Sequence, residues 1–146
     1  MADLTRQAQA IWHGELRKGS GLISGSSGVF QSIPYSVPSR FENGKGTNPE
    51  ELIGAAHAGC FSMFLAAVLA KAGHDSKRIS TTARVSLTKG ESGFRITAIE
   101  LETEASIPGL EKNELQKFVD DAKKNCPVSR ALSEEISVSV QAKLVS

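Results

Sequence analysis

The chain has 146 residues, a length typical of one domain, and its 40% hydrophobic and 23% charged residues are those of an ordinary globular protein. Its 17 basic and 16 acidic side chains nearly cancel and are scattered, so the sequence offers no basic patch for nucleic acid or an anionic membrane. We expect a single domain over residues 1–146, with no nucleic-acid or membrane partner.

The N-terminal residues, Met1–Gln7, carry no apolar stretch behind their charges, which predicts a cytoplasmic protein without a secretory signal. Permanent disulfides are rare in that reducing compartment, so Cys60 and Cys126 are inert buried residues, metal ligands or redox groups. Two separated cysteines do not make a zinc site, and His13 and His74 show no ligand spacing. We therefore expect no metal and no other cofactor.

The first third of the chain favours short strands followed by a loop. Glycines at positions 14, 19, 21, 25 and 28 separate the segments between Ala8 and Phe30, which predicts a hairpin or meander of strands. Pro34 and Pro38, with the Asn-Gly pair that follows them, predict an ordered loop around residues 39–42.

A long helix is predicted from Asn48, which can cap it, to about residue 72, where Gly73 supplies a stop. Residues 52–70 hold no charged side chain if His57 is neutral and approach the length of a membrane span, but their alanines and glycines favour a buried helix of a folded domain. Because the helix is apolar on nearly every side, one sheet face cannot cover it, and a homodimer partner could supply the second layer.

The remaining elements alternate between strand and helix patterns. Residues 79–89 and 94–107 read as strands joined by a turn at 90–93, and residues 136–144 as a final strand. Between them, 110–125 has the spacing of an amphipathic helix, and Pro127 opens a short helix to residue 132. The order βββ-α-ββ-α-α-β predicts an α+β fold.

Two cysteines suffice for one kind of redox chemistry. A thiolate that attacks a peroxide displaces an alcohol or water and becomes a sulfenic acid, with which a second thiol can condense. The site needs a cation beside the thiolate, a carboxylate that fixes the cation, and a resolving thiol within disulfide reach. Cys60, Arg40, Glu50 and Cys126 could fill these roles.

Local sequence leaves open which cysteine attacks. Cys126 precedes Pro127 at a predicted helix N-terminus, where a thiolate is favoured. Cys60 lies in an apolar run, where burial would raise the pKa of its thiol, so it would depend on a cation, for which Arg40 is our candidate. Cys60 could equally be a small hydrophobic residue of the core.

Three stretches carry a resemblance to a known family: Arg40-Phe41-Glu42, residues 46–62 (GTNPEELIGAAHAGCFS) and residues 125–129 (NCPVS). They resemble the motifs of the OsmC/Ohr family of thiol peroxidases, and the resemblance covers essentially the whole chain. The form of the motif that contains His57, together with Trp12-His13-Gly14, is more similar to the OsmC branch than to the Ohr branch.

The resemblance implies an intertwined homodimer in which antiparallel sheets pack around a long buried central helix, with active sites at the interface. It also implies an antioxidant enzyme of the stress response that prefers organic hydroperoxides to hydrogen peroxide and is reduced by a lipoylated protein system. By matching positions, Cys60 is the peroxidatic and Cys126 the resolving cysteine, Glu50 the orienting carboxylate and Arg40 the guanidinium that holds the thiolate. Arg17 is a rival for the last role.

These assignments have a geometric consequence. Ten residues of straight helix separate Glu50 from Cys60 by roughly 15 Å, at about 1.5 Å per residue. Either the helix breaks, which we predict near Gly54, or Arg40 extends between the two side chains as a bridge.

Two other functions fit parts of the sequence. His57 and Cys60 are three residues apart on a predicted helix, a spacing that a Cys-His hydrolase could use, although no orienting group or oxyanion hole is visible. Alternatively, a non-enzymatic module could bind an apolar small molecule in a pocket that would also suit an organic hydroperoxide. The candidate lining residues are Phe41, Phe61, Met63 and Phe64. A binding module has no need of Cys126.

Overall fold

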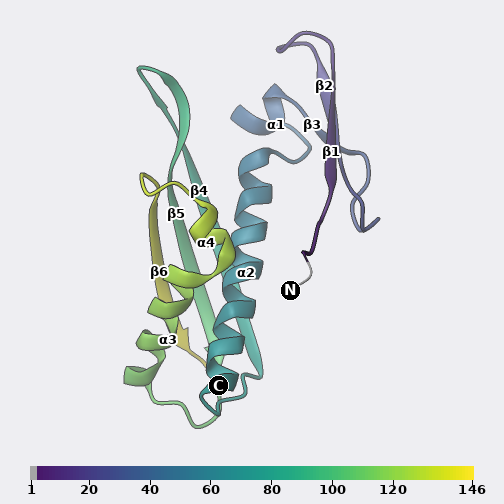
Figure 1. Ribbon diagram of the computed structural model, residues 1–146. Helices are drawn as coiled ribbons and strands as arrows, with labels where there is room; N and C mark the ends of the chain where they lie inside the picture. The colour runs from purple at the N-terminus through teal and green to yellow at the C-terminus, as the bar shows by residue number, and fades with distance from the viewer. Residues whose placement is uncertain (1–2) are drawn as a thin grey trace. The chain divides into compact units, whose positions relative to one another are not determined.

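The computed structural model describes residues 3–146, and the chain forms two compact units, one ending at Glu51 and the other covering Leu52–Ser146. The order of elements along the chain is βββ-αα-ββ-αα-β (Figure 1). The predicted α+β class is confirmed, and one helix was not foreseen. That the whole chain behaves as one domain stays a prediction.

The first unit contains a three-stranded antiparallel sheet in the order β1-β2-β3, formed by β1 (Ala8–His13), β2 (Ser20–Gly25) and β3 (Ile33–Tyr35). Gly21 pairs with Trp12 on one side and with Tyr35 on the other. A Cβ atom at Gly21 would lie 2.2 Å from Cε1 of Tyr35, so only glycine leaves room for the tyrosine ring here.

The predicted loop around residues 39–42 is wrong, because residues 37–41 form the short helix α1 (Val37–Phe41). Ser36 caps this helix: its hydroxyl accepts the Ser39 N–H, and the Ser39 hydroxyl accepts the Ser36 N–H. Pro38 lies in the first turn, where its missing N–H costs nothing. The proline that we interpreted as a breaker therefore helps the helix to begin.

Helix α2 (Pro49–Lys71) begins and ends as predicted. At its start the Asn48 side chain accepts the Glu51 N–H at 2.8 Å. At its end Gly73 has a φ of 88°, and the N–H groups of Gly73 and His74 bond back to the carbonyls of Ala70 and Leu69. This pair of bonds is the Schellman motif that glycine favours.

The predicted break near Gly54 is wrong, because α2 is helical without interruption from Pro49 to Lys71. Gly54 instead lies where the helix meets strand β4 (Arg78–Gly90). A Cβ at Gly54 would be 3.3 Å from Cγ2 of Val85, so the missing side chain permits a close helix-to-sheet approach.

The second unit is built on a sheet in the order β4-β5-β6, with β5 (Gly93–Ser106) antiparallel to β4 and parallel to β6 (Ser137–Leu144). The sheet is therefore mixed, and the expectation of antiparallel sheets holds only for the first unit. The parallel pair arises because helices α3 (Lys112–Asn125) and α4 (Pro127–Ala131) form a crossover between β5 and β6.

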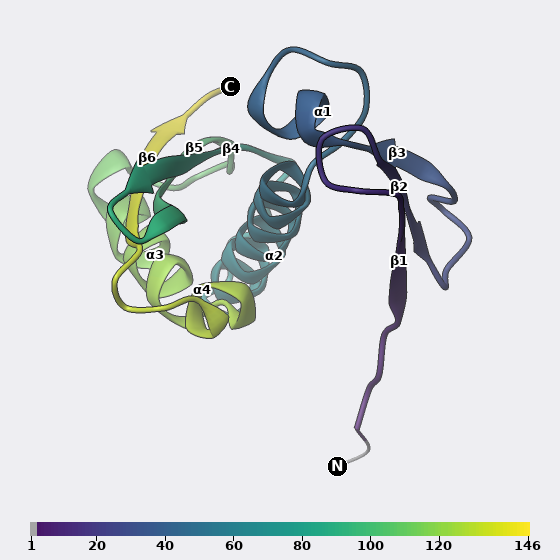
Figure 2. The ribbon, with the colours of Figure 1, turned by 90° about the horizontal axis from the view of Figure 1, so that it is seen from above.

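One hydrophobic core holds the second unit together. Figure 2 shows α2 and α3 on the same face of the sheet. The core is formed by side chains spaced three or four apart on these helices and by alternate residues of β5: Phe61, Leu65 and Leu69 of α2, Leu115, Val119 and Ala122 of α3, and Ile99, Leu101 and Ala105 of the strand. These side chains place α2 firmly on the sheet.

Only one face of α2 is buried in this chain. Its opposite face is exposed and consists of small or flexible apolar residues: Ala55, Ala56, Gly59, Met63, Ala67 and Ala70. The expectation that one sheet face cannot cover the whole helix is therefore confirmed, since no element of the sheet reaches that face. By length and composition α2 could also cross a membrane, a test that the core helix of a folded domain passes as well. The homodimer stays a prediction.

Candidate active site

The structure brings the two cysteines together within the second unit. Cys60 is half-buried on α2, and Cys126 is fully buried at the junction where α3 ends and α4 begins. Both are free thiols, and the Cys60 thiol lies close enough to the Cys126 thiol and to the backbone of Val128 for both to shift its pKa. Two residues 66 positions apart in the sequence (126 minus 60) thus form one thiol pair.

The surroundings of Cys60 work against its ionisation. Burial raises the pKa of its thiol, and the neighbouring Cys126 raises it further, whereas the hydrogen bond to the Val128 backbone lowers it. The predicted effect of burial is confirmed. A nucleophilic Cys60 therefore needs a positive charge that the residues around it in the second unit do not provide.

Cys126 occupies the N-cap of α4. Its Sγ atom accepts the backbone N–H of Ser129 at 3.4 Å and lies 3.0 Å from the Ser129 hydroxyl. Pro127 starts the helix directly after the cap, so the sulfur faces the open N–H groups of the first turn. The rule that an N-cap side chain meets the third helical residue could have identified Ser129, which our reading of the sequence passed over.

His57 is fully buried and faces the same group from α2. Its Nε2 atom lies 2.8 Å from the Ser129 hydroxyl, while Nδ1 has no partner among residues 3–146. Burial lowers the pKa of His57, which favours the neutral imidazole. The hydrogen bond of His57 thus leads through Ser129 to Cys126, and not to Cys60 as a Cys-His hydrolase would require.

The first unit joins the other two predicted residues in an ion pair. Arg40 Nη2 lies 2.7 Å from Glu50 Oε1, and Arg40 Nε lies 3.2 and 3.3 Å from the two carboxylate oxygens. Such a fork fixes the plane of the guanidinium as well as its position. The Glu50 side chain is 10% exposed and that of Arg40 38%, so part of the guanidinium faces solvent.

Hydrogen bonds between the end of α1 and the start of α2 set this pair in place. The Ser39 hydroxyl lies 2.7 Å from the Thr47 carbonyl, and the Asn48 side-chain amide donates to the Ser39 carbonyl at 3.1 Å. Arg40 follows Ser39 directly, and Glu50 lies two residues after Asn48. The rival Arg17 lies in the exposed turn between β1 and β2, where its backbone N–H bonds to Glu15.

An apolar pocket of about 200 Å³ opens beside Arg40 in the first unit. Phe41, a predicted pocket residue, lines it, and the Arg40 guanidinium lies 5.2 Å from the centre of the Phe41 ring. The sequence did not predict Trp12 and Tyr35 as pocket residues; their rings lie 5.4 Å apart across Gly21. The pocket is lined by Trp12, Leu16, Tyr35, Ser36, Val37, Arg40, Phe41 and Pro49.

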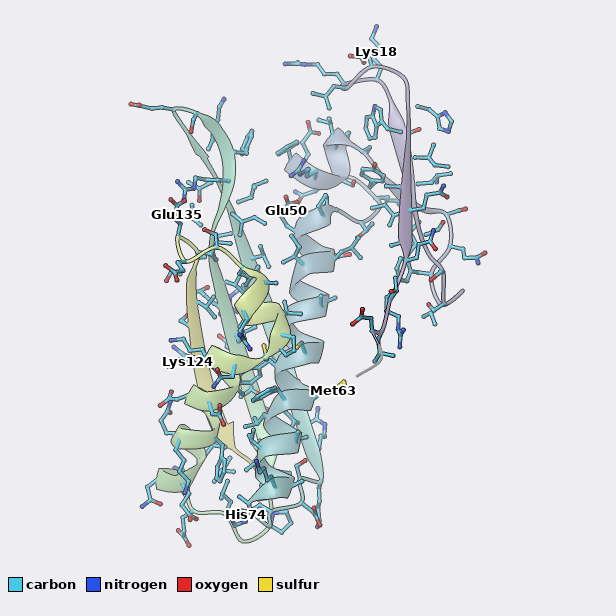
Figure 3. All side chains as sticks on the ribbon, viewed as in Figure 1. Lys18, Glu50, Met63, His74, Lys124 and Glu135 are labelled. Atoms are coloured by element: carbon cyan, nitrogen blue, oxygen red, sulfur yellow. The ribbon has the colours of Figure 1, made fainter. Side chains whose placement is uncertain are left out.

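The other three predicted pocket residues lie on α2. Phe61 is fully buried in the core, and Phe64 packs against that core. Met63 is 77% exposed and projects from α2 on the side away from α3 (Figure 3).

Among residues 3–146, no group of three or more His, Cys, Asp or Glu side chains is arranged to hold a metal ion.

The comparisons with known proteins agree with the resemblance in the sequence. A family model described as OsmC-like protein matches residues 42–141. Peroxiredoxin OsmC of Escherichia coli (strain K12) is 47% identical over 138 residues, which are 94% of this chain and 96% of the relative. An organic hydroperoxide resistance protein of Xanthomonas axonopodis pv. citri is 36% identical over 66% of this chain and 67% of its own length.

Solved structures show the same fold. An organic hydroperoxide resistance protein OsmC from Legionella pneumophila superposes with a TM-score of 0.77 at 29% identity, covering 98% of this chain and 99% of that one. The OhrB protein of Bacillus subtilis gives a TM-score of 0.74 at 27% identity, over 94% and 98% of the two chains.

Proposed function

The chain belongs to the OsmC-like protein family, and from this membership and the paired thiols we propose that it reduces organic hydroperoxides to alcohols through Cys60 and Cys126. It is an oxidoreductase of the peroxiredoxin type. The observation that carries the proposal is the proximity of two free thiols, one half-buried and one fully buried, in a single compact unit.

In the proposed first step the Cys60 thiolate attacks one oxygen of the hydroperoxide. The O–O bond breaks, the other oxygen leaves as an alkoxide that takes up a proton, and Cys60 becomes a sulfenic acid. Cys126 then attacks the Cys60 sulfur, so that a disulfide forms and the sulfenic oxygen leaves as water. A dithiol reductant, for which we propose a lipoylated protein, restores both thiols and carries away the two electrons.

Arg40 is proposed to supply the cation that the Cys60 thiolate requires, with Glu50 holding the guanidinium. Three properties support this assignment: the fork between the two side chains, the partial exposure of Arg40, and the raised pKa of Cys60 in its own unit. A guanidinium stays charged at every physiological pH and can meet a carboxylate and a thiolate with different N–H groups.

The apolar pocket beside Arg40 is the proposed site for the organic group of the substrate. Its walls are mostly aromatic and aliphatic, and its volume of about 200 Å³ suits a small organic hydroperoxide. Hydrogen peroxide has no apolar part to bury there, so it should react more slowly. Names of relatives that refer to organic hydroperoxide resistance support the same substrate class.

We further propose that the protein works as a cytoplasmic homodimer. The exposed face of α2 is a continuous row of small apolar residues on the element that also carries Cys60. Leaving such a row in water costs free energy that a second copy of the chain would recover.

Thiol counting tests the proposal. Reduced protein is treated with one equivalent of cumene hydroperoxide, and mass spectrometry then locates free, oxidised and disulfide-bonded cysteines. We expect rapid loss of both thiols, a disulfide between Cys60 and Cys126 within one chain, and no reaction in the Cys60→Ser variant. Thiols that survive the treatment in the unmodified protein would reject the proposal.

A further inference from the structure

The family assignment leaves one hydrogen-bonded group of the second unit without a role. It consists of His57 Nε2, the Ser129 hydroxyl and Cys126 Sγ, joined by distances of 2.8 and 3.0 Å. The Ser129 backbone N–H also reaches the sulfur, at 3.4 Å. Resting on the proposed function, we infer that Ser129 and His57 are positioning residues for the second step: they aim the Cys126 sulfur at Cys60 and stabilise the negative charge that it carries during the attack.

The tautomer of His57 gives this chain of bonds a direction. Burial favours the neutral ring, which has a single N–H. A proton on Nδ1 would leave a buried donor without a partner among the described residues, whereas a proton on Nε2 is used in the bond to Ser129. His57 Nε2–H therefore donates to the Ser129 oxygen, and the Ser129 hydroxyl proton is left to donate to Cys126 Sγ.

With this direction the Cys126 sulfur accepts two hydrogen bonds from Ser129, one from the hydroxyl and one from the backbone. Both stabilise a thiolate more than a thiol, because bonds to a charged acceptor are about twice as strong as bonds to a neutral one. They also fix where the sulfur points, since Ser129 is itself held by His57. The fully buried sulfur has no exposed surface through which water could do this instead.

The step balances without another co-reactant. As the Cys126 sulfur forms the S–S bond to Cys60, the S–O bond of the sulfenic acid breaks. The proton that Cys126 gives up in this step joins the departing hydroxide, which leaves as water. The Cys126 sulfur is oxidised by one electron and the Cys60 sulfur reduced by one. His57 keeps its single proton throughout.

The experiment follows a single turnover. Reduced enzyme is mixed with one equivalent of cumene hydroperoxide, quenched with N-ethylmaleimide at set times and analysed by mass spectrometry, which separates the Cys60 sulfenic acid from the disulfide. The quantity compared is the rate of disulfide formation relative to the rate of sulfenic acid formation. We expect Ser129→Ala to lower this ratio about tenfold or more, the effect of losing one bond to a charged group.

Conservative variants separate positioning from general structural support. Ser129→Thr keeps the hydroxyl and should retain most of the ratio. His57→Gln can still donate an N–H but cannot accept a proton, so it should stay close to the unmodified enzyme, while His57→Leu should resemble Ser129→Ala. The matched control is Thr103→Val, which removes another buried hydroxyl of the same unit, one bonded to Thr81. It should leave the ratio unchanged.

The possible outcomes distinguish failure of the inference about Ser129 and His57 from failure of the proposed function. A ratio in Ser129→Ala within about twofold of the unmodified enzyme would overturn the inference, as would equal losses in the Gln and Leu variants at position 57. If Ser129→Ala does not fold, the comparison of His57→Gln with His57→Leu tests the inference on its own. Failure of the unmodified enzyme to form any sulfenic acid would instead reject the proposed function, so the two failures are distinguishable.

Discussion

Arg40 and Glu50 face each other as a fork, with three nitrogen-to-oxygen distances between 2.7 and 3.3 Å. The two residues are ten positions apart, and hydrogen bonds between their neighbours, from Ser39 to Thr47 and from Asn48 to Ser39, hold them together. An ion pair supported in this way holds its guanidinium in one orientation.

The fork predicts that lysine cannot replace Arg40. Arg40→Lys keeps the positive charge but cannot bond to both carboxylate oxygens in one plane, so the sulfenic acid at Cys60 should form about tenfold more slowly or worse. Stopped-flow mixing with cumene hydroperoxide measures this rate. Arg17→Lys is the matched control and should leave the rate within about twofold. A larger loss at position 17 than at 40 would assign the guanidinium role to Arg17.

Removing the second thiol should separate the two chemical steps. In Cys126→Ser the first step should persist, the Cys60 sulfenic acid should accumulate, and turnover with a dithiol reductant should fall to background, because no disulfide can form. A probe for sulfenic acid and a turnover assay measure both effects. If the protein is a non-enzymatic module for apolar ligands, Cys126→Ser and the unmodified protein should bind such ligands equally, and neither should turn over hydroperoxide.

The buried His57 should make the protein less stable in acid. Burial lowers the pKa of His57 in the folded state, so below about pH 6.5 the unfolded chain takes up a proton that the folded chain does not. The free energy of unfolding should therefore fall as the pH drops below that value, until the folded imidazole is protonated too. Urea unfolding at about pH 7.5 and about pH 5.5 should show a smaller drop for His57→Gln; an equal drop would contradict the assignment.

The exposed face of α2 predicts how the chain associates. Met63 is 77% exposed on that face, so Met63→Lys should leave the fold intact while placing a charge where a second copy would pack. Light scattering at micromolar concentration should report a dimer for the unmodified protein and a monomer for this variant. Met63→Leu, of similar volume, should remain a dimer. A monomer for the unmodified protein would exclude the proposed assembly.

Regular patterns in the sequence predicted most of the fold. The cap at Asn48, the stop at Gly73 and the alternation along β5 and β6 each depend on residues close together in the chain, and the structure places these elements within one or two residues of their predicted bounds. Pro38 misled us because proline breaks the interior of a helix but suits its first turn. The predicted break at Gly54 depended on the assumption that Glu50 and Cys60 lie close together on one helix, and not on a local pattern in the sequence.

Family motifs in the sequence indicated candidate site residues, whereas contacts between residues far apart in the chain could not be predicted from it. The motifs pointed to Cys60, Cys126, Glu50 and Arg40, and the local spacing of residues could not have ranked Arg40 above Arg17. The bond between His57 and Ser129 joins residues 72 positions apart and follows from how α4 packs against α2. The pairing of Trp12 and Tyr35 likewise depends on strand register, which the short loops did not specify.

The sulfur of Cys126 has a second task, as the cap of a helix only five residues long. A helix of that length cannot hold itself together and relies on such end contacts. Once the sulfur is tied into a disulfide it is a poorer acceptor for the Ser129 N–H, so oxidation should loosen residues 127–131 and reduction should tighten them again. The backbone of these residues would therefore report the redox state of the enzyme: its amide hydrogens should exchange faster in the oxidised, disulfide-bonded form than in the reduced form.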